Sequence, residues 1–283
     1  MIVIEDREEA LRLRAGSGPR PILVPTMGAL HEGHLALIRH ARHLAGESGR
    51  VAVSIFVNPL QFDRPADLKS YPRALEKDLE QCRAEGVDLV FAPKDGSLFA
   101  PDHSVSVRET LLGRHLCGAT RPGHFDGVCT VVLKLFLLLQ PSAAVFGKKD
   151  YQQLAIIRRM VRDLSVNVQV HGMETVREAD GLALSSRNRR LQPSQRADAP
   201  RIRRALVAAR DLSSCGEQKV EAYLHAARHH LDLEAPDDFR IDYLELVDRE
   251  SLQPLSSLNR PALLATACFY GDVRLIDNIE INV

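Results

Sequence analysis

Hydrophobic residues in the first 175 positions alternate between short continuous runs and longer stretches with helical spacing. The short runs have the length of buried strands, and most of them stop at proline, glycine or asparagine, which favour turns. They predict strands at 21–25, 51–57, 87–92, 143–146 and 166–170.

Between these runs, apolar residues recur every three or four positions, as in an amphipathic helix. The spacing predicts helices at 33–44, 66–85 and 152–164. The run at 128–139 could be helix or strand by composition, and its length favours a helix. We expect an interruption at Pro72, because proline lacks the backbone N–H that a helix needs. Alternating strands and helices predict an α/β fold with a doubly wound, Rossmann-like parallel sheet. Such a sheet binds ligands at the carboxyl ends of its strands.

The pattern changes near residue 176, where helix-like stretches are followed by a block of strand-like runs. The predicted helices are 193–213 and 218–232, and the predicted strands are 243–247, 262–270 and 273–281. Gly271 and Asp272 separate the last two strands and suit a hairpin turn. We therefore predict two domains, an α/β domain at 1–175 and a smaller α+β domain at 176–283.

Composition argues against several classes of protein and leaves the predicted fold unchanged. The 283 residues include 37 basic and 37 acidic side chains, so the formal net charge is zero. A balanced charge argues against a general nucleic-acid coat or a binder of anionic membranes. The longest apolar run, 131–139, is too short to span a bilayer, and the acidic N-terminus lacks the apolar core of a signal peptide.

The five cysteines are scattered and odd in number, without the spacing of a zinc site. A disulfide framework is therefore not expected, and a reducing cytoplasm fits best. The cysteines are Cys82, Cys117, Cys129, Cys215 and Cys268.

The strongest chemical signal is the segment PTMGALHEGH at 25–34, directly after the first of these strands. If a helix starts near Gly33, His31 and His34 lie in its first turn, where free N–H groups favour anions. Gly28 and Gly33 would let a nucleotide approach the backbone closely. A loop with surface histidines is the alternative, but the position between a buried strand and a helix favours function. Metal binding is weaker, because no third ligand stands nearby.

The HxGH spacing resembles the signature of nucleotidylyltransferases and class I aminoacyl-tRNA synthetases, which use ATP or CTP. The resemblance implies that His31 and His34 contact the triphosphate and stabilise negative charge that develops on the phosphates.

A second polar segment, FVNPLQF at 56–62, follows the second of these strands. Asn58 and Pro59 favour a turn, and Gln61 would then lie beyond the strand's carboxyl end. An amide both donates and accepts hydrogen bonds, which suits the carboxylate and hydroxyls of a hydroxy acid. The alternative is a solvated glutamine in a turn.

A third segment, GKKDYQQ at 147–153, opens a predicted helix. Lys148 and Lys149 offer point charges for phosphate, and Gln153 lies in the helix's first turn. Asp150 either caps the helix or bonds a ribose hydroxyl. The alternative is a capped helix with two solvated lysines.

The fourth segment, VREADGLALSSRN at 176–188, lies at the predicted domain junction. Ser185, Ser186 and Arg187 provide two hydroxyls and one permanent cation on a loop. Such a loop could close over a nucleotide and screen a reactive intermediate from water. The alternative is a polar linker.

Together, these segments and RPGHFDGV at 121–128 resemble the pantothenate synthetase (pantoate–β-alanine ligase) family in order and spacing. The resemblance covers essentially the whole chain. It implies that pantoate and β-alanine condense at the expense of ATP, with Mg²⁺, through a pantoyl adenylate. It also implies a cytoplasmic homodimer with an ATP- and pantoate-binding domain at 1–175 and a lid at 176–283.

The resemblance assigns roles residue by residue. The ATP site would contain Met27, Gly28, Ala29, Leu30, His31, Glu32, Gly33, His34, Gly147, Lys148, Lys149, Asp150, Val176, Leu184, Ser185, Ser186 and Arg187. The catalytic groups among them would be His31, His34, Lys149, Ser185, Ser186 and Arg187. Gln61 and Gln153 would bind pantoate, with Gln61 also near β-alanine. Arg121 and Asp78 also lie in surroundings that resemble the family, but we rank them lower. The protein ligands of Mg²⁺ are not identified.

Three residues depart from the family pattern. Leu184 replaces a usual methionine, Asp126 stands where arginine is common, and Ala66 replaces an acid. Asp126 puts any phosphate role at that position in doubt and suggests a changed loop or dimer contact. The competing functions are another HxGH adenylyl- or cytidylyltransferase, and a nucleotide-binding protein without catalysis.

Overall fold

The computed structural model describes residues 1–14, 18–62, 68–69, 71–94 and 96–282. Ala66 lies outside these residues. The contacts among Cα atoms divide the chain into two compact units, each discontinuous in sequence. The first is Met1–Glu109, Gly123–Lys148 and Ile156–Glu174; the second is Thr110–Pro122, Lys149–Ala155 and Thr175–Val283. The division into domains at residue 175 stays a prediction.

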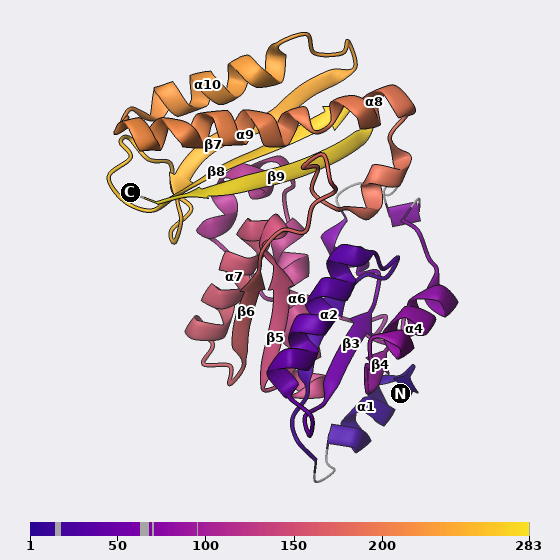
Figure 1. Cartoon of the computed structure of the whole chain (residues 1–283). Helices are drawn as coiled ribbons and strands as arrows, with labels where there is room; N and C mark the ends of the chain where they lie inside the picture. Colours follow the sequence, from indigo (N-terminus) through magenta and orange to yellow (C-terminus); the bar gives the residue numbers. More distant parts are fainter. Residues whose placement is uncertain (15–17, 63–67, 70, 95, 283) are drawn as a thin grey trace. The chain divides into compact units, whose positions relative to one another are not determined.

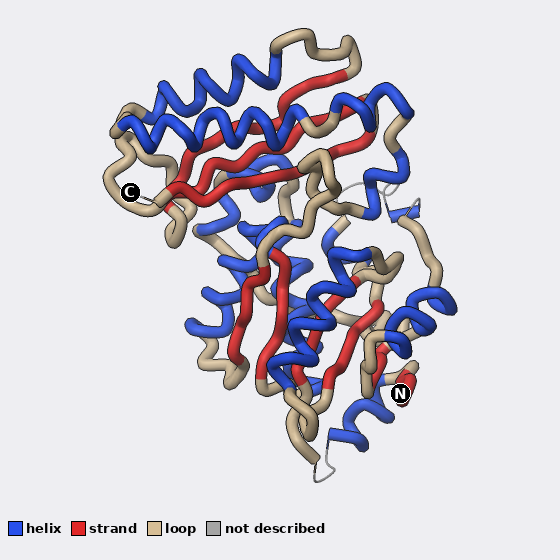
Figure 2. Tube along the Cα trace, in the orientation of Figure 1, coloured by secondary structure: helices blue, strands red, loops and turns tan. Residues whose placement is uncertain are grey.

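The first unit is built on a parallel sheet (Figures 1 and 2). Among the described residues, its strands lie in the order β1 (Ile2–Ile4), β4 (Leu89–Phe91), β3 (Val51–Ile55), β2 (Ile22–Thr26), β5 (Ala143–Gly147) and β6 (Gln169–Met173). Every neighbouring pair is parallel. The predicted doubly wound α/β fold is thereby confirmed.

The helices of this unit follow from apolar residues spaced to cover the sheet. They are α1 (Arg7–Arg14), α2 (Glu32–Ala45), α4 (Leu75–Ala84), α6 (His124–Leu139) and α7 (Tyr151–Asp163), whose first five residues group with the second unit. Ile38 and Ala41 of α2 pack in one core with Val24 and Val53 of the sheet. Consecutive residues of the inner strands β2, β3 and β5 are buried, so both faces of these strands are covered, as expected for a parallel sheet between helices.

The order of strands reverses between β2 and β5. β2 pairs with β3 on one side and with β5 on the other, where Ile22 lies opposite Ala143. The carboxyl end of β2 leads into residues 27–34, and that of β5 leads into Lys148. A reversal of this kind leaves a crevice at the carboxyl ends of the two strands, which is the usual ligand position in such sheets.

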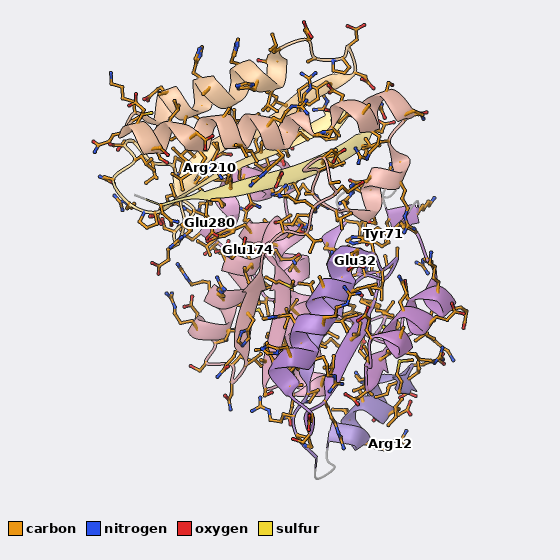
Figure 3. All side chains as sticks on the ribbon, in the orientation of Figure 1. Arg12, Glu32, Tyr71, Glu174, Arg210 and Glu280 are labelled. Carbon is orange, nitrogen blue, oxygen red and sulfur yellow. The ribbon has the colours of Figure 1, made fainter. Side chains whose placement is uncertain are left out.

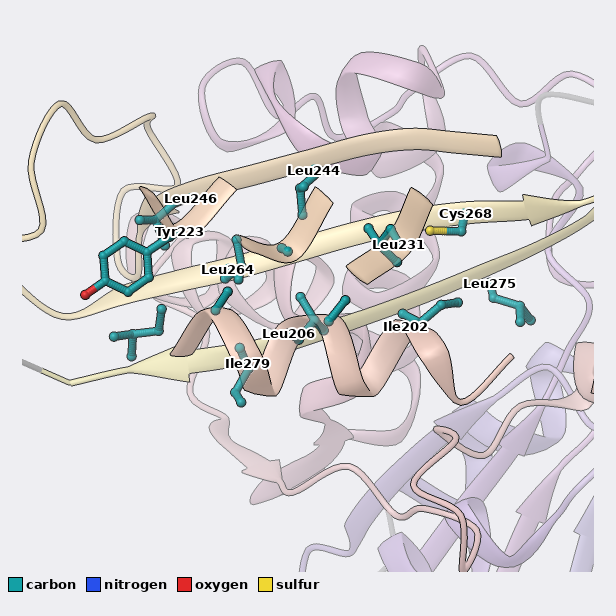
Figure 4. Packing of buried hydrophobic residues seen from close by; sticks show 14 of the residues in the cluster. Ile202, Leu206, Tyr223, Leu231, Leu244, Leu246, Leu264, Cys268, Leu275 and Ile279 are labelled. Atoms are coloured by element: carbon teal, nitrogen blue, oxygen red, sulfur yellow. The ribbon is translucent and has the colours of Figure 1, made fainter. Parts of the chain in front are cut away.

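The second unit holds an antiparallel sheet, β7 (Phe239–Asp248), β8 (Ala262–Tyr270) and β9 (Val273–Ile281), in that order. Tyr270 pairs with Val273, and Gly271 adopts a φ of +55°, so the predicted two-residue hairpin at 271–272 is confirmed. The helices are α5 (Leu116–Thr120), α8 (Pro193–Asp198), α9 (Arg201–Asp211) and α10 (Val220–Asp232). Figure 4 shows the core between α9, α10 and this sheet; it includes Ile202, Leu206, Tyr223, Leu231, Leu264 and Ile279.

Some predicted elements differ from the structure. The predicted helix at 193–213 is two helices, α8 and α9, because Pro200 lies between them and cannot donate a backbone hydrogen bond. The strand predicted at 166–170 begins three residues later, at Gln169. The helix predicted at 66–85 is interrupted as expected: residues 68–69 are helical, residues 71–74 are not, and α4 begins at Leu75, while residues 66–67 and 70 lie outside the described residues. β1 and α1 were not predicted.

None of the described helices combines the length and apolar character needed to cross a bilayer. All five cysteines are free thiols, as the scattered spacing predicted.

Candidate active site

The loop after β2 has an unusual backbone conformation. Gly28 adopts a φ of +80° and Ala29 a φ of +51°, a region that non-glycine residues rarely occupy. Thr26 begins the turn: its hydroxyl donates to the carbonyl of Ser54 at 2.8 Å and accepts from the Gly28 N–H at 3.2 Å. The backbone is therefore bent sharply between the strand and α2.

Asp78 of α4 holds this bend in place. Its carboxylate oxygens accept hydrogen bonds from the N–H groups of Ala29 and Leu30, each at 2.8 Å. The side chain is 1% exposed, so the bonds form away from water and are correspondingly strong. A methyl group on Gly28 would meet Asp78 Oδ2 at 2.9 Å and Ile55 Cγ2 at 3.0 Å, so both the conformation and the space require glycine.

His31 and His34 cap the start of α2 reciprocally, as the predicted helix start near Gly33 implied. His31 is the N-cap residue, and its Nδ1 accepts from the Gly33 N–H at 3.2 Å. The Nδ1 of His34 accepts from the His31 N–H at 3.3 Å, and the ring centroids are 4.1 Å apart. Because both Nδ1 atoms accept, each neutral ring carries its proton on Nε2. The helix start thus presents two imidazole N–H donors beside its positive dipole end.

Gln61 is buried, which excludes the solvated turn considered above. It ends a short 3₁₀ helix, Pro59–Gln61, whose N-cap is Asn58. Asn58 Nδ2 donates to Gln61 Oε1 at 3.1 Å and to the Gly127 carbonyl at 3.0 Å. Gln61 Nε2 donates to the thioether sulfur of Met27 at 3.0 Å, and thioethers are weak acceptors. A carboxylate or hydroxyl at this place would be a stronger partner.

Gly127 of α6 allows the 3₁₀ helix to approach. A Cβ at this position would lie 2.3 Å from the carbonyl oxygen of Leu60 and 2.8 Å from the Gln61 nitrogen. His124, also on α6, contacts the Gln61 carbonyl oxygen through Nδ1 at 2.7 Å. The first turn of α6 therefore contacts the backbone of Gln61 directly.

A pocket of about 310 Å³ lies beside the bent loop in the first unit. Its walls include Met27, Gly28, Ile55, Phe56 and Asp78, so it lies next to the carboxyl ends of β2 and β3. This volume matches the lower end of small-molecule sites. Met27 lines the pocket and accepts the hydrogen bond from Gln61, so Gln61 lies next to the pocket.

Gly147 ends β5, and Lys148 follows it at the carboxyl edge of the same sheet. Lys148 forms an ion pair with Glu174, which follows β6 and is labelled in Figure 3. The Glu174 side chain is 80% exposed, so this pair is screened by water and exchanges readily.

In the second unit, Lys149 and Asp150 end a 3₁₀ turn, Lys148–Asp150, that leads directly into α7. Lys149 Nζ contacts Asp150 Oδ2 at 3.4 Å. Gln153 is half-buried, whereas its neighbour Gln152 is buried and bonds the carbonyls of Leu112 and His115, each at 2.8 Å. Gln152 is therefore a structural residue.

The segment 176–188 forms a narrow hairpin followed by a 3₁₀ helix. The N–H of Leu184 donates to the Val176 carbonyl at 3.0 Å. Ser185 caps the 3₁₀ helix Ser186–Arg190, with its Oγ accepting from the Arg187 N–H at 3.3 Å. Ser185, Ser186 and Arg187 are half-buried. A hydroxyl that accepts a backbone bond still has its own proton to donate.

The structure thus brings the predicted residues together in two groups. His31, His34 and Gln61 are connected through residues 27–30 in the first unit. Lys149, Asp150, Gln153 and the residues at 176–187 belong to the second unit. The predicted convergence of both groups on one crevice stays a prediction.

The sequence analysis did not predict the side-chain contacts of two asparagines that organise these groups. Asn58 holds Gln61, and Asn188 Nδ2 donates to Glu178 Oε1 and to the Ala183 carbonyl, each at 3.1 Å. Asn58 carried a recognisable signal, since an N-cap asparagine before proline is common. The contacts of Asn188 depend on the hairpin fold and left no such signal.

Asp126 has a local structural partner. It lies in the first turn of α6, where an acid suits the helix dipole, and its Oδ1 accepts from the Glu109 N–H at 3.0 Å. Asp126 thus contacts the backbone of the loop that contains Glu109.

The fold and the site define an α/β protein in which a histidine-capped helix start lies where the order of sheet strands reverses. Residues 3–280 match the model of one family, described as pantoate-beta-alanine ligase. The chain belongs to this family, a family of ligases, which confirms the resemblance inferred from its motifs.

Named relatives support the assignment. The pantothenate synthetase of Akkermansia muciniphila is 56% identical over 260 residues, covering 92% of each chain. The crystal structure of pantothenate synthetase from Thermus thermophilus is 46% identical, with a TM-score of 0.91 over 100% of both chains. That of pantoate-beta-alanine ligase from Francisella tularensis, complexed with "beta-gamma ATP" and beta-alanine, is 32% identical. Its TM-score is 0.79, over 99% of this chain and 97% of that one.

Proposed function

We propose that this chain condenses pantoate with β-alanine at the expense of ATP, releasing pantothenate, AMP and pyrophosphate. The observation that carries the proposal is the paired-histidine start of α2 at the strand reversal, in a chain that matches the ligase family over residues 3–280.

The first step needs stabilisation of negative charge. A carboxylate oxygen of pantoate bonds to the α-phosphorus of ATP, and the bond to the bridging oxygen breaks, so pyrophosphate leaves with that electron pair. The two Nε2–H groups of His31 and His34 would donate to phosphate oxygens as charge develops. Fixed donors of this kind need no reorganisation during the reaction, which is why they accelerate it.

The second step forms the amide. The amine of β-alanine, after losing a proton, attacks the acyl carbon of pantoyl adenylate, and AMP leaves with the electrons of the acyl–oxygen bond. Gln61 would orient pantoate in both steps, because its Nε2–H is held toward a weak thioether acceptor that a substrate oxygen replaces favourably. Gln153 would be the second pantoate ligand.

The second-unit segments would bind the nucleotide. Lys149 would reach a phosphate and Asp150 the ribose, while Val176 would lie against the adenine. Leu184, Ser185, Ser186 and Arg187 would close over the phosphates. Half-buried donors on a short hairpin are suited to this task, because they can be covered by substrate without a large desolvation cost.

Mg²⁺ would enter with the nucleotide. Within the described residues, no group of three or more histidine, cysteine or acidic side chains is arranged to hold a metal ion. Magnesium commonly binds through substrate phosphates, water and one or two carboxylates, so the site fits MgATP as the substrate. The ion would neutralise phosphate charge. We further propose a cytoplasmic homodimer.

The decisive assay combines purified protein with pantoate, β-alanine, ATP and Mg²⁺. We expect AMP and pantothenate in equal amounts, and ATP–pyrophosphate exchange that requires pantoate. Exchange at the same rate without pantoate would instead support another HxGH nucleotidyltransferase. No AMP release in the complete mixture would support a nucleotide-binding protein without catalysis.

A further inference from the structure

Strand β9 carries an acid where its pattern calls for an apolar residue. Side chains alternate between the two faces of a strand, and Val273, Leu275, Ile279 and Ile281 all belong to the hydrophobic core of the second unit. Asp277 lies in the middle of this row, and its side chain is 4% exposed. A buried carboxylate is costly unless it is paired and hydrogen-bonded, so its partners identify what it does.

The side-chain partner of Asp277 is Arg177, in the first leg of the 176–184 hairpin, and Asp277 Oδ1 also accepts from the Asn278 N–H at 2.8 Å. The two side chains form a bidentate pair, with Nη1–Oδ2 at 2.7 Å and Nη2–Oδ1 at 2.8 Å. Arg177 Nη1 also donates to the Gly181 carbonyl at 3.1 Å, and the Arg177 backbone pairs with Ala183. One carboxylate on β9 therefore holds both the entry and the tip of the hairpin that leads into Ser185.

The next residue, Asn278, faces the opposite side of the same strand. Its Nδ2 donates to the carbonyl of Lys149 at 2.9 Å, and it is 9% exposed. Two residues further along, Glu280, labelled in Figure 3, accepts from the Tyr151 hydroxyl at 3.3 Å. This face of β9 thus holds the residues that open α7.

We propose that Asp277 and Asn278 are positioning residues that set the two nucleotide-binding segments of the second unit in register with each other. The proposal rests on the proposed function of those segments. Because the two residues are adjacent on one strand, the hairpin leading to Ser185–Arg187 and the Lys149–Asp150 turn are both anchored within one residue of β9. Neither side chain needs to touch ATP to act in this way.

The test substitutes Asp277→Asn, which keeps the shape but removes the charge that Arg177 requires, and Asn278→Leu, which removes the donor to Lys149. The matched control is Asp242→Asn. Asp242 of β7 accepts from Arg274 of β9 at 2.8 and 2.9 Å, and both of these side chains are 16% exposed. This pair lies on the same sheet but adjoins Cys117 and Thr120 rather than the nucleotide-binding segments.

ATP affinity by calorimetry, KM for ATP and for pantoate, and the melting temperature are measured for each variant. We expect Asp277→Asn and Asn278→Leu to weaken ATP binding and raise its KM about tenfold, with little change in the KM for pantoate. Asp242→Asn should lower the melting temperature as Asp277→Asn does, without changing ATP affinity.

Equal ATP affinity in all variants, or equal losses in the control, would overturn the positioning role while the proposed function stands. Wild-type protein that neither binds ATP nor releases AMP would overturn both. If Asp277→Asn does not fold, Arg177→Lys provides the same test, because lysine retains the charge but lacks the two-pronged geometry. An unchanged KM for ATP in that variant would also count against the proposal.

Discussion

The two units anchor their candidate site segments with different kinds of interaction. In the first unit, a buried carboxylate, Asp78, accepts from backbone N–H groups of the loop itself. In the second unit, the hairpin is held mainly through side chains, by Arg177 to Asp277 and by Arg196 to Glu178 and Asp180.

This difference predicts different mobility. Backbone bonds to a buried acid fix the main-chain path of residues 28–30, and Gly28 has no space for a side chain. The Arg196 pairs are partly exposed, at 31–41% of each side chain, so water and salt weaken them. We therefore expect residues 28–30 to be preorganised. We expect the 176–184 hairpin, which is held by the buried Arg177–Asp277 pair and the more exposed Arg196 pairs, to rearrange more readily.

The largest effect should come from the first unit's preorganised donors. We expect His34→Asn and His34→Ala each to reduce adenylate formation by roughly 100- to 1,000-fold, as loss of a fixed donor to a transition state typically does. Asparagine can still accept the His31 N–H bond, whereas alanine cannot. Only His34→Ala should therefore lower the melting temperature. Unchanged turnover in both would remove His34 from the chemistry.

The next test acts on the anchor itself. Asp78→Asn places an amide against two backbone donors and leaves one of them unsatisfied, which should cost about 1–3 kcal/mol of stability. We expect kcat to fall about tenfold as the loop loosens. Asp88→Asn is the control: Asp88 accepts the Val51 N–H at 2.8 Å at the opposite end of β3, and should affect stability alone. Equal kcat values in the two variants would contradict the anchoring role.

A smaller effect should separate the two substrates. Gln61→Ala removes the amide that Asn58 holds, and we expect the KM for pantoate to rise about five- to tenfold. The KM for ATP should change less, because the nucleotide is assigned to other residues. Initial rates with each substrate varied in turn give both constants from one preparation. The reverse ranking would mean that Gln61 is misassigned.

The smallest effect tests the exposed pairs of the second unit. The hydrogen bond from Arg196 lowers the pKa of Asp180 below its ordinary value of 3.8. Because the pKa of Asp180 is lower in the folded than in the unfolded protein, ionised Asp180 stabilises the fold above pH 3.8. This stabilisation is lost as the pH falls through the pKa that Asp180 has in the folded state. Asp180→Asn should thus cost about 1 kcal/mol or less at pH 7. Urea titrations give the free energy of unfolding of both proteins, and the difference between wild type and Asp180→Asn should shrink below pH 3.8. If the difference persists there, the stabilisation by Asp180 is not ionic.

The sequence predicted the parts of the fold that depend on local pattern. The strand before His31, the helix after it and the hairpin at 271–272 all follow from neighbouring residues. β1 is only three residues long, which is too short for a periodic signal. The local pattern also could not tell whether the helix continues through Pro200 or ends there and a new helix begins.

Of the candidate site residues, those in continuous motifs were predicted, whereas the long-range contacts that support them were not. His31, His34 and Ser185 could be located because their motifs are continuous in sequence. The contacts of Asp78 with Ala29 and of Asn278 with Lys149 join residues 49 and 129 positions apart. No spacing rule connects residues so distant, so only the folded chain reveals which carboxylate or amide supports which loop.

Gly127 illustrates how the missing side chain of one residue constrains others. Because a Cβ there would lie 2.3 Å from the Leu60 carbonyl oxygen, any larger residue must displace the turn that carries Gln61. Such a displacement would also break the hydrogen bonds that Asn58 donates to Gln61 and to the Gly127 carbonyl. We therefore expect the effects of substitutions at positions 58, 61 and 127 to be non-additive, because the three residues share one set of contacts.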